Sequence, residues 1–166
     1  MVTTTDAIKR LREATGAGIM DSKRALEDAA GDMEKAKALL RERGIAKAEK
    51  RAGRDVGQGL VHGYIHAGRV GALVEVNCET DFVARTDDFK HLVHEIAMQV
   101  ASMNPKYIAQ EDMPEGADED PKYVVLLNQD YIRESRKTIK DLIQETTAKT
   151  GEHIRVARFI RYELGQ

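Results

Sequence analysis

The 166-residue sequence has very little cysteine and no long apolar run. Its one cysteine, Cys78, excludes an internal disulfide and fits a reducing compartment. No stretch reaches the roughly 20 apolar residues that a membrane-spanning helix needs. The first six residues lack the basic and apolar regions of a signal peptide. These absences predict a cytoplasmic protein with no membrane partner.

A dominant charge of one sign is also missing. Lys and Arg total 26 against 28 Asp and Glu, which gives a net charge of −2 at pH 7. A balanced chain has no global attraction to nucleic acid or to an anionic membrane. The hydrophobic share of 42% is sufficient for a real core at this length. We therefore expect a soluble globular protein.

Strong catalytic or nucleotide-binding motifs are lacking as well. His62 and His66 lie on one predicted strand and Cys78 ends the next, but a thiol in a Val-rich strand is more often a small buried hydrophobe. Gly16-Ala17-Gly18 precedes a helix, yet the chain has neither a Walker lysine motif nor a dinucleotide fingerprint. We expect no enzyme and no cofactor.

A candidate metal site has only two of its ligands. His91, His94 and Glu95 form a His-x-x-His-Glu run, and the i, i+3 spacing places both imidazoles near one helix face. The run does not have the zinc protease order and no third ligand is evident. We interpret these histidines as surface residues and expect no metal.

Helical spacing and capping residues predict three short helices between residues 5 and 44. The first predicted helix starts at Thr5, with Thr4 or Thr5 as its cap, and stops at Gly16-Ala17-Gly18. The second runs from Ser22 to Ala30 and is capped by Asp21. The third runs from Met33 to Arg43, is capped by Asp32 and is ended by Gly44. Three helices of this size bury little surface. They form either a module that presents a binding surface or a simple folding appendage.

The rest of the chain predicts an α+β core with an antiparallel sheet packed on helices. The first predicted elements are a basic, helical connector at 46–56, a β-hairpin of 60–66 and 70–78, and an amphipathic helix from Thr86 to before Pro105. An acidic loop at 111–120 and a short strand or helix at 123–127 follow. The last two elements are a helix from Thr138 to Gly151 and a strand that has the following residues on one face: Ile154, Val156, Arg158, Ile160, Tyr162 and Leu164. The predicted domains are 1–45, 46–56 and 57–166.

The most informative stretch runs from Val74 to Arg85. An apolar strand pattern leads directly into Asp81, followed by the large aromatic Phe82. A strand that ends by presenting a carboxylate and a phenyl ring together is suited to probing a partner protein. The alternative is that Asp81 begins a helix and Phe82 is a core aromatic, and the pattern alone leaves both interpretations open.

Two long motifs and the C-terminal segment resemble one protein family. Residues 15–26 (TGAGIMDSKRAL) and 76–85 (VNCETDFVAR) are similar to the two signatures of bacterial elongation factor Ts, and 153–165 is similar to its last strand. The resemblance covers nearly the whole chain. It implies a guanine nucleotide exchange factor for elongation factor Tu in translation elongation. It also implies that the N-terminal helices form a module of the ubiquitin-associated type.

The resemblance also implies roles for particular residues. Thr80, Asp81, Phe82 and Val83 would enter the G domain of GDP-bound elongation factor Tu and dislodge its Mg²⁺, so that GDP leaves and GTP binds. Residues expected to contact the same domain are Arg12, Ile19, Met20 and Lys23. His66, in a Tyr-x-His pattern, resembles a further contact of the family.

The chain departs from many family members in its length. Many carry two related core subdomains or a helical insertion before the last segment, whereas this sequence has one hairpin-plus-helix unit and only the short acidic stretch at 111–120. This is the pattern of the short form, in which two copies supply the surface that a longer chain makes alone. We expect a homodimer and a two-to-two complex with the GTPase. Ile19 and Ser22 stand where the family often has methionine and cysteine.

Two other functions remain open. One is an adaptor that binds a protein without changing its nucleotide. The other is RNA binding through the basic connector residues Lys47, Lys50, Arg51 and Arg54. These cations have no interleaved aromatics and the net charge is negative, so we expect no direct contact with nucleic acid.

Overall fold

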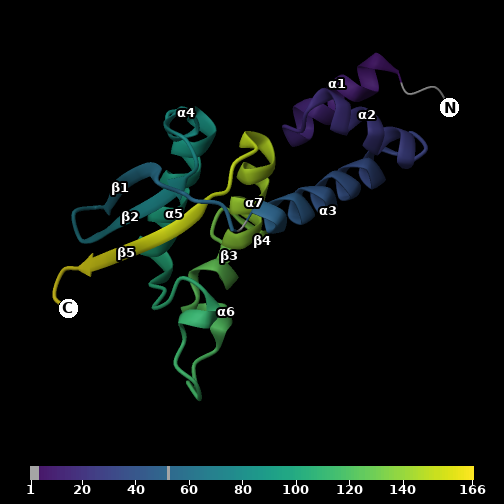
Figure 1. The fold of residues 1–166 in the computed structure, drawn as a ribbon. Helices are drawn as coiled ribbons and strands as arrows, with labels where there is room; N and C mark the ends of the chain where they lie inside the picture. Colours follow the sequence, from purple (N-terminus) through teal and green to yellow (C-terminus); the bar gives the residue numbers. More distant parts are fainter. Residues whose placement is uncertain (1–3, 52) are drawn as a thin grey trace.

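The computed structural model describes residues 4–51 and 53–166 and confirms the α+β class, with three N-terminal helices followed by a sheet backed by helices (Figure 1). In chain order the elements are α1 (Thr5–Thr15), α2 (Ile19–Asp28), α3 (Met33–Arg51), β1 (Gln58–His66), β2 (Val70–Cys78), α4 (Asp81–Ala84), α5 (Asp87–Met103), the 3-10 helix η1 (Gln110–Asp112), α6 (Pro121–Val124), the 3-10 helix η2 (Leu126–Asn128), β3 (Asp130–Tyr131), β4 (Glu134–Thr138), α7 (Ile139–Thr150) and β5 (Arg155–Glu163). None of the helices in these described ranges has the length and apolar content to cross a membrane.

The first and third helices begin where the capping residues predict. The Thr4 hydroxyl accepts a hydrogen bond from the Ala7 N–H, and Gly16, with a left-handed φ of 69°, ends α1. Oδ1 of Asp32 accepts from the backbone N–H groups of two residues in the first turn of α3, each at 3.0 Å. Local chemistry is therefore sufficient to place these ends.

The predicted start of the second helix is wrong. α2 begins at Ile19 rather than Ser22, because the extended residue Gly18 is its N-cap and the Gly18 carbonyl accepts from the Ser22 N–H at 2.9 Å. Asp21, the predicted cap, lies in the first turn, where a carboxylate stabilises the positive end of the helix dipole. The helix ends at Asp28, two residues earlier than predicted.

The prediction that Gly44 ends the third helix is also wrong. α3 continues to Arg51, and Gly44 is buried in its middle, where an added Cβ would lie 3.3 Å from Cβ of Ala148 on α7. Gly16 lies against the same end of α7, since its Cβ would be 2.8 Å from Cε of Lys149. These two glycines bring the N-terminal helices close to α7, which a local pattern does not reveal.

The predicted boundaries at residues 45 and 56 stay predictions. α3 runs continuously through the first of them, and Ala52, inside the predicted connector, lies outside the described residues. The buried side chains nevertheless form two clusters. The small cluster joins the three N-terminal helices and contains Leu11, Ala25, Leu26, Ala29 and Ala36. The larger one lies between the sheet and its helices.

Ser22 places an unpaired hydroxyl inside the small N-terminal cluster. Its side chain is fully buried and Oγ has no hydrogen-bond partner. A buried hydroxyl without a partner keeps its desolvation penalty, so Ser22→Ala should raise the free energy of unfolding by about 1 kcal/mol. Urea denaturation measures the change. Ser102→Ala, at an exposed position in α5, controls for the helix propensity of alanine. An equal gain in both variants would contradict the assignment.

The main sheet has the strand order β1-β2-β5, with both pairs antiparallel. The predicted hairpin is confirmed, and the pairing runs from Gln58 opposite Cys78 to His66 opposite Val70. β2 and β5 change register, since Val76 pairs with Val156 and Glu75 with Arg158. Ala157 is therefore an extra residue in β5, which is a β-bulge.

The bulge overturns the prediction that alternate residues of the last strand share one face. Val156 is buried against α5 and α7, whereas Arg158, Ile160 and Tyr162 are exposed. One inserted residue moves all later side chains to the opposite face, because strand side chains alternate with period two. The apolar residues of β5 thus serve two different surfaces.

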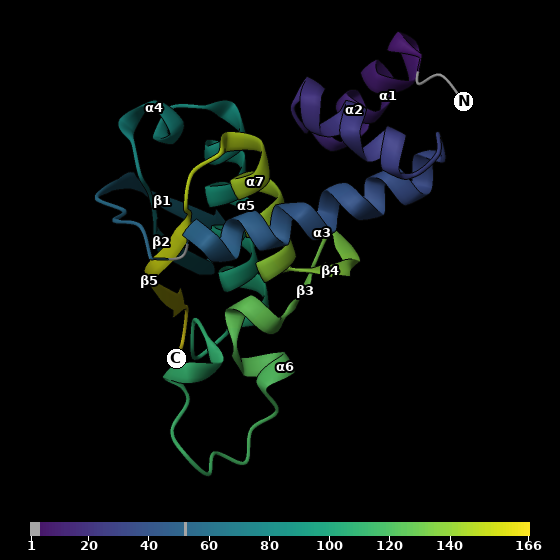
Figure 2. The same cartoon turned by 45° about the vertical axis from the view of Figure 1, so that its right-hand side comes forward.

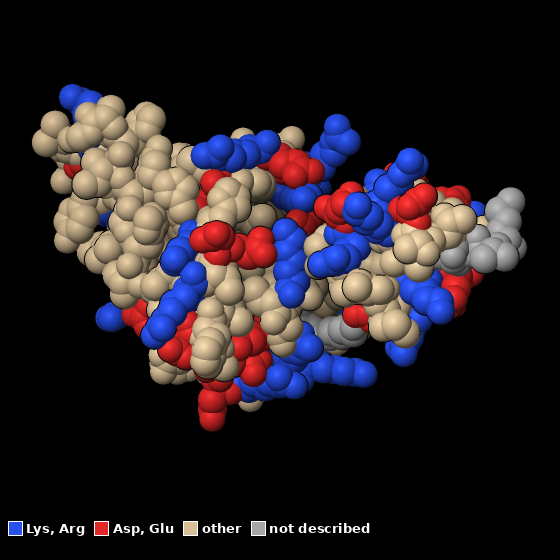
Figure 3. All heavy atoms as spheres, turned by 90° about the horizontal axis from the view of Figure 1, so that it is seen from above, with Lys and Arg blue, Asp and Glu red and all other residues tan. Residues whose placement is uncertain are grey.

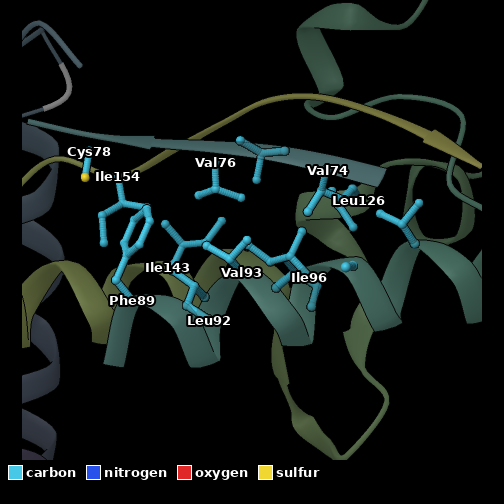
Figure 4. Close-up of a cluster of buried hydrophobic side chains, with 14 of the residues drawn as sticks. Val74, Val76, Cys78, Phe89, Leu92, Val93, Ile96, Leu126, Ile143 and Ile154 are labelled. Atoms are coloured by element: carbon cyan, nitrogen blue, oxygen red, sulfur yellow. The ribbon is translucent and has the colours of Figure 1, made fainter. Parts of the chain in front are cut away.

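The inner face of the sheet packs on α5 (Figure 4). α5 is capped by Thr86, whose hydroxyl accepts from the Phe89 N–H at 3.3 Å, and it ends at Met103, with Asn104 as its C-cap just before Pro105, as predicted. Figure 4 shows side chains of α5 facing the sheet, and α7 adds to the same layer. The labelled residues are Val74, Val76, Cys78, Phe89, Leu92, Val93, Ile96, Leu126, Ile143 and Ile154.

Two further segments connect α5 to α7. The stretch 111–120, predicted as an acidic loop, contains the end of η1 and is otherwise irregular; Figure 2 shows it extending away from the sheet. The stretch 123–127, for which strand and helix were both open, holds the end of α6 and the beginning of η2. The helix capped by Thr138 and closed by Gly151 is confirmed as α7.

Candidate functional site

The turn that follows β2 presents one phenyl ring to solvent. α4 is a single helical turn with Thr80 as its N-cap, and the Thr80 hydroxyl accepts a hydrogen bond from the Val83 N–H at 3.4 Å. Val83 and Ala84 are buried in the core, whereas Phe82 is 80% exposed. The interpretation of Phe82 as a core aromatic is therefore wrong, and its ring is accessible to a partner.

Asp81 lies beside this ring in the first turn of α4. Its Oδ2 is 2.8 Å from Nη2 of Arg85, one helical turn later; the Arg85 side chain is exposed and that of Asp81 is half-exposed. An exposed i, i+4 ion pair contributes only about 0.5 kcal/mol. Asp81 is thus a helix-start residue, as the alternative interpretation had it. Its pairing is nevertheless weak enough to be exchanged for donors of a partner protein.

The carboxylates of Glu152 and Glu79 accept hydrogen bonds that fix the α4 turn to the rest of the core. Oε2 of Glu152, in the loop between α7 and β5, accepts from the Thr80 N–H at 3.0 Å, and its Oε1 accepts from the Thr80 hydroxyl at 2.5 Å. Glu79 accepts from the His153 N–H at 2.6 Å and from Arg54 at 3.2 Å. These donors hold the pKa of the Glu79 carboxyl below its ordinary value, the His153 N–H contributing most.

The sequence did not predict that Glu79, Glu152 and Arg54 support the α4 turn. The bond between Glu152 and Thr80 spans 72 residues of chain, and the bond between Glu79 and His153 spans 74. No local pattern reports contacts of that range. The only local sign is Gly151, which ends α7 with a left-handed φ of 78° and so directs the next residue back toward the sheet.

Cys78 is part of the same support. It is fully buried, its Sγ donates to the Thr80 carbonyl at 3.1 Å, and burial together with the nearby Glu152 carboxylate raises the pKa of the thiol to about 11. A thiol that stays protonated and covered is a packing residue. The prediction that Cys78 is a small buried hydrophobe is confirmed.

The N-terminal candidates are exposed residues of α1 and α2. Ile19 and Met20 occupy the first turn of α2 and each is 58% exposed, which is unusual for apolar side chains of this size. Arg12 and Lys23 are exposed on the same pair of helices, and Lys23 lies 3.8 Å from Glu27. In Figures 1 and 2 these helices and α4 lie apart, both toward the top of the view.

His66 lies far from the α4 turn. It ends β1 and pairs with Val70, the first residue of β2, whereas the turn follows Cys78 at the other end of that strand. Nine residues of extended strand span about 27 Å. His66 is exposed, with Nδ1 3.1 Å from the Tyr64 hydroxyl. One copy of the chain therefore does not bring His66 together with Phe82.

The basic connector is partly engaged within the chain. Lys50 is exposed and Arg51 half-buried, and Arg54 pairs with Glu79. The side chain of Lys47 lies outside the described residues. The face shown in Figure 3 carries Lys, Arg, Asp and Glu interspersed rather than a continuous basic patch. This pattern does not favour RNA binding through that face.

The histidines singled out as metal candidates face different surroundings. His91 is exposed, while Nδ1 of His94 lies 3.1 Å from Nε2 of His62 on β1. Across residues 4–51 and 53–166, no cluster of three or more His, Cys, Asp or Glu side chains is arranged to hold a metal ion. The His62–His94 contact instead joins β1 to α5.

This contact predicts a loss of stability in mild acid. Burial, with the adjacent His94 ring adding to it, lowers the pKa of His62 below its ordinary value near 6.5. The folded state therefore favours the neutral ring. The stability that neutral His62 contributes is present above pH 6.5. It is lost as the pH falls through the lowered pKa that His62 has in the folded state. Thermal unfolding followed from pH 8 to pH 5 should show this drop.

A substitution identifies the histidine responsible. His62→Gln should remove part of that drop, because burial also lowers the pKa of His153, and the exposed His91→Gln should leave the drop unchanged. If the His62 variant kept the full drop between pH 6.5 and pH 5, the cause would lie in another group.

The fold and the exposed α4 turn are those of a protein-binding factor. The family model described as Elongation factor TS matches residues 45–124. Elongation factor Ts of Coprothermobacter proteolyticus is 50% identical over 190 residues, covering 96% of both chains. That of Thermoanaerobacter sp. strain X514 is 51% identical over 191 residues, covering 96% of this chain and 94% of the relative. That of Thermotoga maritima is 48% identical, covering 97% of this chain and 96% of the relative.

The chain belongs to the elongation factor Ts family. It is a nucleotide exchange factor for elongation factor Tu in translation elongation, and it has no catalytic activity of its own. A translation elongation factor of this family works in the cytoplasm, as predicted. The 190 aligned positions exceed the 166 residues of this chain, so at least 24 positions of the alignment have no counterpart in it. The chain is therefore a short-form member.

Proposed function

We propose that the chain releases GDP by inserting the turn of Thr80, Asp81, Phe82 and Val83 into the nucleotide-binding domain of GDP-bound elongation factor Tu. The observation that carries this proposal is the 80% exposure of Phe82 on a turn anchored in the core. Mg²⁺ bridges the phosphates of a bound nucleotide and neutralises their charge. A side chain that dislodges the groups holding Mg²⁺ weakens the binding of GDP without any covalent step.

The N-terminal helices supply a second contact with the same domain. The exposed side chains of Ile19 and Met20 offer an apolar patch, Lys23 adds positive charge one helical turn further along α2, and Arg12 adds positive charge on α1. Binding energy from this remote contact holds the α4 turn at its target. Coupling between ligands is reciprocal, so a factor that weakens the binding of GDP is itself bound more weakly when a nucleotide is present. The factor is therefore released when GTP binds, which completes the exchange.

The direct experiment is a nucleotide-release assay. Elongation factor Tu loaded with a fluorescent GDP analogue is mixed with excess GDP, with and without this chain. The expected result is release that accelerates with the concentration of the chain. Unchanged release, with binding still detected by calorimetry, would favour an adaptor. Binding of structured RNA at physiological ionic strength, with a strong salt dependence, would instead support the RNA hypothesis.

We also propose that the active species is a homodimer that forms a two-to-two complex. The outer face of the sheet supports this proposal. Residues opposite one another in the register share a face, and on the uncovered face they form an apolar surface. Its exposed members are Val61, Ile65, Leu73, Ile160 and Tyr162. Exposed apolar patches of this kind mark interfaces.

The separation of His66 from Phe82 also favours a dimer. A second copy packed on the outer face can bring its own His66 toward the surface that the first copy approaches with Phe82. Each GTPase would then contact both copies, which is the two-to-two arrangement.

A charge placed on that face tests the dimer. Ile160 lies on the outer face of the sheet, opposite Leu73. Ile160→Asp should convert the dimer, with twice the 18.5 kDa mass of the chain, into monomer. Sedimentation equilibrium measures the mass. Ile132→Asp is the matched control, because Ile132 is similarly exposed but lies at the β3–β4 turn. A wild-type monomer, or a dimer that survives Ile160→Asp, would overturn the proposal.

A further inference from the structure

We propose that Glu152 is a positioning residue for nucleotide exchange, because its carboxylate fixes Thr80 and thereby sets the direction in which Phe82 projects. The inference rests on the proposed role of the α4 turn. It adds a residue from the other end of the chain to the machinery. Glu152 lies beneath the turn and acts through Thr80, so it is not expected to touch the GTPase.

The geometry of Thr80 makes this contact decisive for the turn. Its N–H and its hydroxyl both donate to Glu152, at 3.0 and 2.5 Å, one to each carboxylate oxygen. The same hydroxyl accepts from the Val83 N–H and caps α4. Hydrogen bonds to an ionised carboxylate are short and strong. Glu152 therefore fixes both the backbone and the side-chain rotamer of the capping residue.

A second carboxylate, that of Glu79, also fixes the α4 turn. While Glu152 holds the backbone at Thr80, Glu79 accepts from the backbone N–H of His153, which follows Glu152 in sequence. Each carboxylate thus bonds a residue next to the other. The crossed pair ties the end of β2 to the beginning of β5, and Arg54 bonds Glu79 from outside. A crossed pair resists both sliding and tilting of the turn.

The turn needs this support because it is too short to hold its own shape. α4 has four residues, and a helix of one turn is not stable in isolation. The Phe82 ring is 80% exposed, so packing within the chain does not fix its direction. Its position is set by buried Val83 and Ala84 on one side and by Thr80 on the other. A wedge that enters a partner already ordered loses less conformational entropy on binding.

The first test is Glu152→Ala in the release assay. Loss of two charge-assisted bonds at the cap should lower the maximal rate of GDP release about tenfold, with little change in the concentration that gives half the maximal rate. Glu152→Gln keeps an oxygen that can accept from the Thr80 N–H, so it should recover part of the rate. Glu145→Ala is the matched control, because Glu145 bonds Lys137 at 2.9 Å and has no bond to α4. Its rate should equal that of the wild type.

The second test separates positioning from a general loss of folding. In a chain that already carries Phe82→Ala, the additional Glu152→Ala should cost less than twofold, because the ring that Glu152 directs is gone. Circular dichroism and thermal unfolding establish that each variant is folded. Full additivity of the two substitutions would overturn the inference, as would a wild-type maximal rate for Glu152→Ala.

The two proposals fail in distinguishable ways. If Phe82→Ala alone leaves release unchanged, the proposed role of the α4 turn fails and the inference fails with it. If Phe82→Ala slows release but Glu152→Ala does not, only the positioning role of Glu152 is wrong.

Discussion

Replacing Phe82 with alanine should slow the GDP release that this chain promotes by about 30-fold, which corresponds to about 2 kcal/mol for burial of a phenyl ring. The ring is 80% exposed in the free chain, so nearly all of its apolar surface is available for burial in the partner. Stopped-flow release of a fluorescent GDP analogue from elongation factor Tu measures the effect.

The same substitution should leave the fold intact. Phe82 makes no part of either buried cluster, and truncation of an exposed side chain changes the free energy of unfolding by about 0.5 kcal/mol or less. Phe82→Leu retains an apolar side chain and should keep part of the activity. If Phe82→Ala exchanged nucleotide at the wild-type rate, the ring would not be the wedge and the proposed mechanism would be wrong.

Replacing Phe89 with alanine should have the opposite outcome. Phe89 is fully buried at the beginning of α5, seven residues after Phe82, and it belongs to the cluster beneath the sheet (Figure 4). Truncating a buried phenylalanine removes its transfer free energy and leaves a cavity, which together cost about 4 kcal/mol. Urea denaturation should show this loss as a lower midpoint.

Phe82→Ala and Phe89→Ala form a matched pair with the same chemistry. The first should change exchange and keep stability, and the second should lower stability. At temperatures where the Phe89 variant is still folded, its exchange rate per folded molecule should be near that of the wild type. A Phe89→Ala variant as stable as the wild type would contradict the packing between α5 and the sheet.

Much of the fold is predictable from local chemistry. Thr86, Asp32, Thr138 and Gly16 each cap or end a helix through bonds to residues no more than four positions away, and all four were placed correctly. Alternation and a short turn were enough for the β1–β2 hairpin. The α4 motif was likewise located from an apolar strand running into Asp81 and Phe82.

The errors at Gly44 and in the last strand share one physical origin. Gly44 is a helix stop by local rules, yet it lies inside α3 because Ala148 packs on it from α7. The bulge at Ala157 depends on the register with β2, which the strand's own alternation does not contain. In both places a contact between segments about 80 to 100 residues apart outweighs a local preference.

The amino-acid order was sufficient for the family and for the helix ends formed by nearby bonds, and it predicted a probe at Thr80 to Val83, a role that stays a prediction. It left open whether Phe82 was core or surface, and it did not predict that Glu152 lies under Thr80. Burial and long-range hydrogen bonds belong to the packed molecule, because they depend on which distant segment arrives beside each residue. In this chain the loop between α7 and β5 packs against the end of β2 and places the Glu152 carboxylate beneath Thr80, while the Phe82 ring stays exposed.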